Sequence, residues 1–175
     1  IHIAGSTDNL VSNNIIHKNL FDGISVDGAD VQINFNTIYA NNRYGLYITG
    51  STSVVDAENN WWGRNNPIFV SAGGTIPSGS IDIFVNEGNV ARARYLVMNV
   101  AVSTDRSDRT GSTYKNILEM DLTHNNLNED TTSSNSNVPV NIPDTIPVNF
   151  ATTMGTINGS VGTRGGKAVA IFKGA

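Results

Sequence analysis

The sequence predicts an all-β fold in which the C-terminal coils of a right-handed parallel β-helix precede an antiparallel β-sandwich. Two observations lead to this prediction. A strand-and-turn phrase recurs at a spacing of 22 residues near the N-terminus, and after residue 95 apolar residues alternate at the period of a β-strand. The composition agrees, because only 15% of the residues are charged and 17 are glycine, which suits short strands joined by many turns.

The recurring phrase lies within residues 1–66. Gly23-Ile24-Ser25-Val26-Asp27-Gly28 returns 22 positions later as Gly45-Leu46-Tyr47-Ile48-Thr49-Gly50, with apolar residues at the same alternate positions. A remnant, Ile1-His2-Ile3-Ala4-Gly5, precedes both copies. A period of this length is typical of one coil of a β-solenoid, where each strand pairs in parallel with its counterpart in the next coil. We therefore predict β-helix coils over residues 1–66.

Asparagines return at the same point of each coil. Asn14, Asn36 and Asn60 are expected to lie above one another at one turn, where their side-chain amides bond the backbones of successive turns. Asn19 and Asn41 suggest a second ladder. Sugar or calcium binding is the functional alternative, but recurrence with the coil period favours a structural, internal role.

Three aspartates could be considered for catalysis. Paired carboxylates on one face of a β-helix are what polysaccharide-cleaving enzymes use, and Asp22, Asp27 and Asp30 are close in sequence. They flank Gly23 and Gly28, however, and Asp together with Gly is ordinary turn chemistry. We therefore predict no catalytic residue and no enzymatic activity.

Trp61-Trp62-Gly63 ends the repeat, and Pro67 cannot donate a hydrogen bond to a further ladder. Trp62 takes the inward position of Ile38 and is expected to close the core of the β-helix. Trp61 points the other way. We expect it to pack against the following segment, because an open β-helix end must be covered, although an exposed tryptophan could also stack on a sugar.

Residues 67–94 are predicted to form a capping or linker segment between two domains. Gly73-Gly74 and Pro77-Ser78-Gly79 are turn signals, and Ile81 to Val85 reads as a strand at the junction.

Residues 95–175 are predicted to form the sandwich. Apolar side chains fall on one side of each of two strands, at Leu96, Met98, Val100 and Val102 and at Leu118, Met120, Leu122 and His124. A sandwich of the immunoglobulin type has about seven strands, and fewer can be placed here. At least one edge strand is therefore expected to be missing.

Two residues of this second part invite a functional interpretation. His124 continues the inward face of its strand near Glu129 and Asp130, but no second histidine is close in sequence, so we expect a buried histidine bonded to a loop carboxylate or carbonyl. Asn158-Gly159-Ser160 is a possible glycosylation sequon. Because Asn-Gly also favours tight hairpins, we expect a turn there.

The string from Val54 to Gly63, which ends in Asn59-Asn60-Trp61-Trp62-Gly63, resembles the last β-helix coil of adhesin-like surface proteins of methanogenic archaea. In that group an invasin- or intimin-type Ig-like domain follows, and its phrases are matched here by residues 95–100, 121–126, 146–150 and 155–157. The resemblance implies that the second part is an incomplete Ig-like β-sandwich. It also implies export, a cell-surface location and a role in attachment or surface structure, with no catalytic residue and no cofactor.

Composition narrows the range of partners. The formal net charge of −4 and the pI near 5.2 provide no basic stripe for nucleic acid. The absence of cysteine excludes thiolate metal sites and disulfides within this chain, and no apolar run approaches the ~20 residues that span a bilayer. No metal, nucleic acid or membrane span is predicted.

Three functions are compatible with these patterns. The first is a non-enzymatic extracellular or cell-surface segment for structure or adhesion, whose partner would be a cell-wall or surface glycan or protein. The second is a subunit of a self-assembling extracellular filament or sheath, completed by neighbours at the open β-helix end and the unpaired sheet edge. The third is the non-catalytic end of a carbohydrate-active β-helix enzyme.

Overall fold

The computed structural model describes residues 1–75, 81–92, 94–103, 115–132 and 141–174. All regular secondary structure within these ranges is β-strand. The turn signal predicted at Pro77-Ser78-Gly79 lies outside the described residues.

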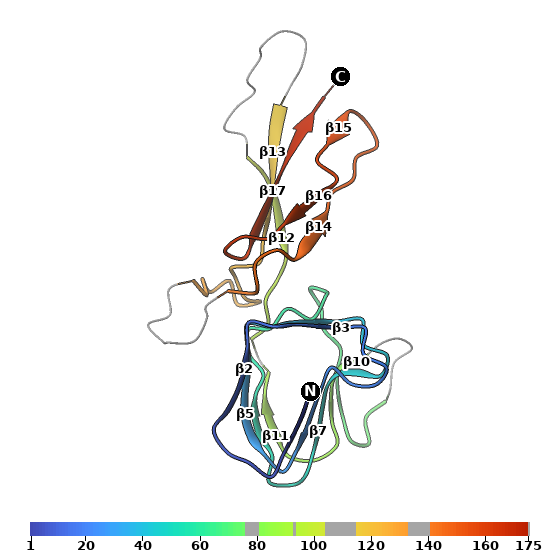
Figure 1. The fold of residues 1–175 in the computed structure, drawn as a ribbon, viewed down its shortest axis with the longest axis vertical. Coiled ribbons are helices and arrows are strands. Elements are labelled where there is room, and N and C mark those ends of the chain that lie inside the picture. The colour runs from blue at the N-terminus through green and yellow to red at the C-terminus, as the bar shows by residue number, and fades with distance from the viewer. Residues whose placement is uncertain (76–80, 93, 104–114, 133–140, 175) are drawn as a thin grey trace.

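The N-terminal half is a stack of coils with three sheets on its sides (Figure 1). The first sheet consists of β1 (His2–Ala4), β4 (Ile24–Asp27), β7 (Tyr44–Thr49), β10 (Ile81–Val85) and β9 (Phe69–Ser71), in that spatial order. The second sheet consists of β2 (Asn9–Ser12), β5 (Asp30–Asn34), β8 (Val54–Asp56) and β11 (Asn89–Ala91). The third contains β3 (Ile15–His17) and β6 (Thr37–Tyr39), and a bridge from Thr37 to Trp61 extends it.

Parallel pairing follows the recurrence in the sequence. Ile24 in β4 is in register with Leu46 in β7, a separation of 22 positions, and the inward side chains of both strands are fully buried. Stacked aliphatic side chains of this kind fill the interior of the β-helix from Val11 to Val85. The predicted all-β fold with a parallel β-helix is thus confirmed.

The coils extend beyond residue 66, which corrects the predicted boundary. β10 pairs with β7 and β11 pairs with β8, so residues 81–91 build a further coil instead of a linker. Ile83 is in register with Leu46 at a separation of 37 positions, because β9 and its flanking turns are inserted between the two strands. This insertion breaks the 22-residue period and hides the coil from a search for fixed repeats.

The inserted segment also changes the order of the strands. β9 precedes β10 in sequence but lies at the edge of the sheet. β10 therefore occupies the position between β7 and β9. β10 approaches β7 closely at Gly45, where an added Cβ would lie 2.6 Å from the carbonyl oxygen of Asp82. A glycine is therefore required at this position.

The C-terminal half contains two antiparallel sheets. The larger one has the order β12 (Asn99–Ser103), β13 (Lys115–Asp121), β17 (Lys167–Lys173) and β15 (Thr156–Ile157). The smaller one pairs β14 (Pro147–Asn149) with β16 (Ser160–Gly162). Met120, Leu122, Ile142 and Ala168 form the centre of the core of this second module.

The first strand of the second module begins later than expected. Leu96 is fully buried but lies before β12, in a connecting segment, whereas Val100 and Val102 within β12 are 61% and 55% exposed. β12 is the edge strand of its sheet, and the smaller sheet has only two described strands to cover the larger one. Alternation in the sequence reveals which side chains share a face but not whether another sheet covers that face.

Hydrogen bonds join the two halves continuously. The N–H of Leu96 donates to the carbonyl of Asn60 at 3.0 Å, and the N–H of Asn59 donates to the carbonyl of Arg94 at 3.0 Å. The N–H of Val97 donates to the backbone carbonyl of His124 at 3.0 Å, and the N–H of Asn126 donates to the backbone carbonyl of Tyr95 at 2.9 Å. The second module therefore extends from the β3–β6 side of the stack, as Figure 1 shows, and not from its end.

Candidate functional site

The asparagines at the first turn form a ladder through the stack. The backbone N–H of Asn14 donates to Oδ1 of Asn36 at 3.0 Å, and that of Asn36 donates to Oδ1 of Asn60 at 2.9 Å. Nδ2 of Asn36 also donates to the carbonyls of Val11 at 2.8 Å and Asn34 at 3.1 Å. Because Asn36 and Asn60 are fully buried and their amides are used internally, they are not available to a sugar or an ion.

A second ladder lies at the next corner. The backbone N–H and Nδ2 of Asn19 donate to Oδ1 of Asn41 at 3.2 and 2.7 Å, and Nδ2 of Asn41 donates to Ile16 at 3.2 Å. Both ladders satisfy backbone groups where the chain turns.

The end of the first ladder is capped by the second module, a feature that sequence reasoning missed. The N–H of Asn59 donates to the carbonyl of Arg94, and the N–H of Leu96 donates to the carbonyl of Asn60. Tyr95, between Arg94 and Leu96, therefore occupies the position of the ladder that follows Asn60. Tyr95 cannot supply an amide. Its N–H is bound instead by Oδ1 of Asn126 at 2.9 Å. The corresponding signal in the sequence is the Asn-Asn pair at residues 125–126, which lies outside the repeat.

The two tryptophans point in opposite directions. Trp62 is 1% exposed and lies in the core of the β-helix, although its Nε1 has no hydrogen-bond partner among the described residues. Trp61 is 7% exposed and packs in the core of the second module with Leu96 and Met120. Trp61 therefore covers the side of the stack and not its end, because the coil formed by β10 and β11 continues the stack beyond it.

His124 is not buried, which corrects the prediction. β13 ends at Asp121, whose Oδ1 accepts hydrogen bonds from the N–H and hydroxyl of Thr123 at 2.7 and 2.6 Å. This turn breaks the strand period, so the His124 side chain is 33% exposed. Its Nδ1 lies 3.1 Å from the Thr123 hydroxyl and 3.9 Å from Oδ2 of Asp121, and Asp130 meets His124 through a backbone bridge.

Asn158 is exposed but does not form a hairpin turn. It lies between β15 and β16, which belong to different sheets, and neither Asn158 nor Gly159 has a positive φ. Oδ1 of Asn158 accepts a long hydrogen bond of 3.4 Å from the N–H of Ile171. The predicted turn is wrong because Asn-Gly favours a tight hairpin only where the flanking strands pair with each other.

The three aspartates considered for catalysis do not share one hollow. Asp22 forms an ion pair with Arg43, whose Nε lies 2.8 Å from Oδ1 of Asp22. Asp27 is placed at the end of β4, and Asp30 lines a groove.

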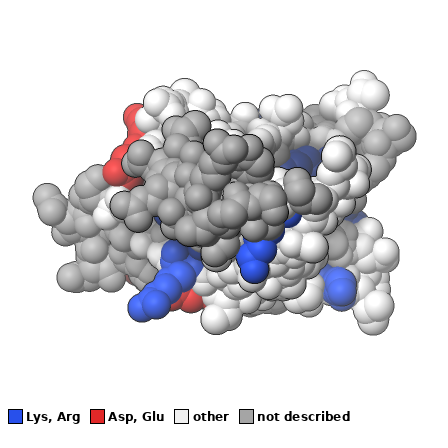
Figure 2. Space-filling model, turned by 90° about the horizontal axis from the view of Figure 1, so that it is seen from above, with Lys and Arg blue, Asp and Glu red and all other residues white. Residues whose placement is uncertain are grey.

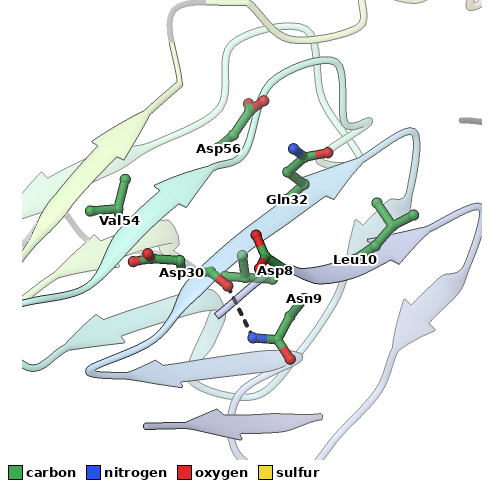
Figure 3. A pocket seen from close by; sticks show the side chains of 8 residues that line it. Asp8, Asn9, Leu10, Asp30, Gln32, Val54 and Asp56 are labelled. Atoms are coloured by element: carbon green, nitrogen blue, oxygen red, sulfur yellow. Dashed lines mark hydrogen bonds between the residues drawn. The ribbon is translucent and has the colours of Figure 1, made fainter. Parts of the chain in front are cut away.

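That groove, with a volume of about 460 Å³, lies on the outer face of the second sheet (Figure 3). Leu10 and Val54 are 52% and 54% exposed there and provide apolar surface. Gln32, Asp30 and Asp56 provide amide and carboxylate groups from neighbouring strands. Apolar surface interspersed with hydrogen-bonding groups suits a neutral, hydroxyl-rich ligand, whereas the carboxylates would repel an acidic one.

The two modules are also joined by an ion-pair cluster around Arg94. Nη1 of Arg94 lies 3.0 Å from Oε2 of Glu58 in the β-helix, and its Nε lies 2.9 Å from Oε2 of Glu129 in the second module. Hydrogen bonds from Asn125 and Arg94 lower the pKa of Glu129. We call Arg94, Glu58, Glu129 and Asn125 the junction cluster. In this cluster Arg94 is paired with one carboxylate from each module.

Charge is sparse on the described surface. In Figure 2, which looks onto the second module, lysine and arginine side chains are separated by uncharged surface. Within the described ranges, no three histidine or carboxylate groups come together in a way that could hold a metal ion. The same residues include no helix of the length and hydrophobicity needed to cross a membrane.

Comparison with known proteins identifies the N-terminal part. A family model described as "Right handed beta helix region" matches residues 1–93, which is more than half of the 175 residues. The match ends close to the last strand of the additional coil, β11. No curated protein and no solved structure matches the chain.

Proposed function

Because this chain belongs to the right-handed β-helix family, we propose that it is a structural or adhesion segment of an extracellular or cell-surface protein and not an enzyme. In this proposal the second module is an incomplete Ig-like sandwich, and the resemblance to adhesin-like surface proteins supports the location. The β-helix acts as a stiff support, and the second module is displayed at its side.

The observation that carries the proposal is the continuous hydrogen bonding between support and displayed module. β3 pairs with β6, and Thr37 in β6 bridges to Trp61. The carbonyl of the neighbouring Asn60 accepts a hydrogen bond from Leu96, which itself bridges to Asn125. A link of this kind transmits force through backbone hydrogen bonds and not through a flexible tether. Such mechanical continuity suits a role in attachment.

The groove on the second sheet is the surface that we assign to a glycan partner within this proposal. Leu10 and Val54 would contact the apolar face of a sugar ring, while Gln32 and Asp30 would bind its hydroxyl groups. A neutral wall polysaccharide fits this lining better than an acidic one because the groove contains carboxylates and no cation.

The location is tested by labelling intact cells of the source organism with an antibody against the chain. Surface labelling without permeabilisation is expected. Labelling that requires permeabilised cells would contradict the proposed location.

The partner is tested by sedimentation of the purified chain with insoluble wall polysaccharides. We expect the wild-type chain to bind neutral polysaccharide, Gln32→Ala to weaken binding several-fold, and Asn42→Ala, an exposed substitution outside the groove, to leave it unchanged. Release of soluble reducing sugars during the incubation would instead support a carbohydrate-active enzyme.

A further inference from the structure

Strand β12 is the least protected sheet edge in the described part of the chain. It is five residues long, whereas the other described edge strands have two to four residues. Its sequence, Asn99-Val100-Ala101-Val102-Ser103, contains no charged residue, proline or glycine. Soluble proteins normally protect long edges with such residues, because an unpaired row of N–H and C=O groups attracts another strand.

Other described edges are shorter than β12, and some carry such protection. β14 begins with Pro147, which has no N–H to offer, and β15 has only two residues. The edges of the β-helix at β9 and β11 are three residues long. β12 is therefore the described edge at which pairing with a strand of another molecule is expected.

Two valines of β12 lie on the buried face of the sheet without being buried themselves. Val100 is in register with Met120 and, one strand further, Ala168, which are 1% and 2% exposed, yet Val100 is 61% exposed. Val102 is 55% exposed, although Ala170 in the same row is fully buried. The apolar face therefore continues past the part that the smaller sheet covers, up to β12, whose outer side pairs with no described strand.

The sequence of β12 is self-complementary. If two copies pair antiparallel about a two-fold axis through Ala101, Val100 of one copy lies opposite Val102 of the second copy, and Ala101 lies opposite Ala101. An axis perpendicular to the sheet keeps the same face of both sheets on one side, so all four valines gather on one continuous apolar strip. Directly opposed β-branched residues stabilise antiparallel pairs, and no like charges meet in this register.

We propose that β12 pairs with β12 of a second copy of this chain and forms a closed, two-fold dimer with one antiparallel sheet running through both second modules. Backbone hydrogen bonds along the edge and burial of the valine pairs hold it together. Because both copies use the same surface, the interface closes on itself and does not propagate. The dimer thus differs from the filament, which needs two different ends.

Light scattering after size exclusion tests the dimer. The wild-type chain is expected to approach twice its 18.7 kDa mass as its concentration rises. Val100→Lys/Val102→Lys and Val100→Glu/Val102→Glu should each remain monomeric, because like charges oppose each other across the axis. An equal mixture of the two variants should recover the dimer mass, because opposite charges then meet. A wild-type chain that stays monomeric at every soluble concentration would overturn the proposal.

A matched control distinguishes the edge from the opposite face of the same sheet. Val169 and Ile171 are both 44% exposed on that face, and Val169→Lys/Ile171→Lys should leave the dimer intact. If this variant becomes monomeric while the β12 variants remain dimeric, two sheets pack face to face and the edge proposal is wrong. Circular dichroism verifies that each variant is folded.

A crosslink tests the register without placing a charge on β12. The chain contains no cysteine, so Ala101→Cys introduces a single thiol, and Cα atoms of directly opposed antiparallel residues lie within the range that a disulfide spans. Mild oxidation should give a covalent dimer of Ala101→Cys, whereas Val54→Cys, at an exposed position in the β-helix, should remain mostly monomeric. Equal crosslinking of both variants, or none of either, would overturn the pairing.

Discussion

The two halves of this protein satisfy their polar groups in different ways. In the β-helix, each coil repeats the contacts of the previous one, and buried asparagines such as Asn36 and Asn60 bind the turns internally. In the second module, charged groups are partnered at the surface, as in the contact of Lys167 with Glu119 at 2.9 Å and with Asp121 at 3.2 Å. From this comparison we expect the β-helix to be stable by itself and the second module to depend on docking to the β-helix and on pH.

The largest effect is expected at the docking contact. Trp61→Ala would remove the β-helix side chain from the core of the second module and leave a cavity beside Leu96 and Met120. We expect the free energy of unfolding of the second module to fall by about 4 kcal/mol. Urea unfolding followed by circular dichroism should then show two transitions, the first belonging to the second module.

Trp61→Phe is the matched control for docking, since it keeps an aromatic ring and should cost much less. If Trp61→Ala lowered the stability of the whole chain in one unchanged transition, the modules would not be separable, and the contrast between them would be wrong.

A somewhat smaller effect is expected for the ladder of the β-helix. Asn36→Ala would leave the N–H of Asn14 and the carbonyl of Val11 without their bonds to the side chain. We expect a loss of about 3 kcal/mol in the free energy of unfolding of the β-helix. Asn42→Ala, which removes one exposed hydrogen bond to Leu20, should change it by less than about 1 kcal/mol. Equal effects at the two positions would show that the ladder does not hold the coils together.

Acid should weaken the second module before the β-helix. Burial alone would raise the pKa of Asp121, but hydrogen bonds from Thr123 and the Lys167 ammonium outweigh it and lower that pKa. A carboxyl whose pKa is lower in the folded state stabilises the fold above its unfolded pKa of about 3.9, and this stabilisation is lost as pH falls through the folded pKa. Urea midpoints of the second module should fall below about pH 4, and Asp121→Asn should flatten this dependence.

Asp82 in β10 has a pKa shift opposite to that of Asp121, and its effect on stability at low pH is opposite too. Its burial raises the pKa above the usual range, despite a hydrogen bond from the N–H of Ile68 and the nearby Arg64. A raised carboxyl pKa means that the folded state binds the proton more tightly, so this group adds stability as pH falls. Asp82→Asn should remove that gain. An acid-induced loss that is equal in both modules would contradict the comparison.

The smallest effect is expected in the junction cluster. Arg94→Ala would break the contacts with Glu58 and Glu129, but these ion pairs are exposed and screened by solvent. We expect a slight loss of second-module stability at low salt that disappears at high salt, measured by thermal unfolding at both ionic strengths. A loss that persists at high salt would mean that Arg94 acts through packing.

Much of the β-helix could be predicted from local sequence. The 22-residue recurrence predicts the register of Ile24 with Leu46, because stacked coils repeat the same environment at each turn. The same reasoning predicted opposite directions for Trp61 and Trp62, since side chains alternate along any strand. The asparagine ladder follows from the same period.

The candidate site could be predicted only in part. Asp30 was considered for catalysis, but its placement beside Leu10, Gln32 and Val54 in one groove depends on how three strands stack. His124 was assigned to a buried face because its strand seemed to continue, whereas Thr123 turns the chain toward Asp121. Competition between a side-chain hydrogen bond and strand pairing is not visible in an apolar pattern.

The sequence by itself determined the all-β class, the coil period and which side chains point inward, because these depend on contacts between neighbouring, repeated segments. Only the tertiary structure decided that β10 inserts between β7 and β9, that Asn126 caps the last coil, and that the second module docks on the side of the stack. These features join residues whose separation follows no period. Shape and hydrogen-bond complementarity in three dimensions select them, and no local pattern records that selection.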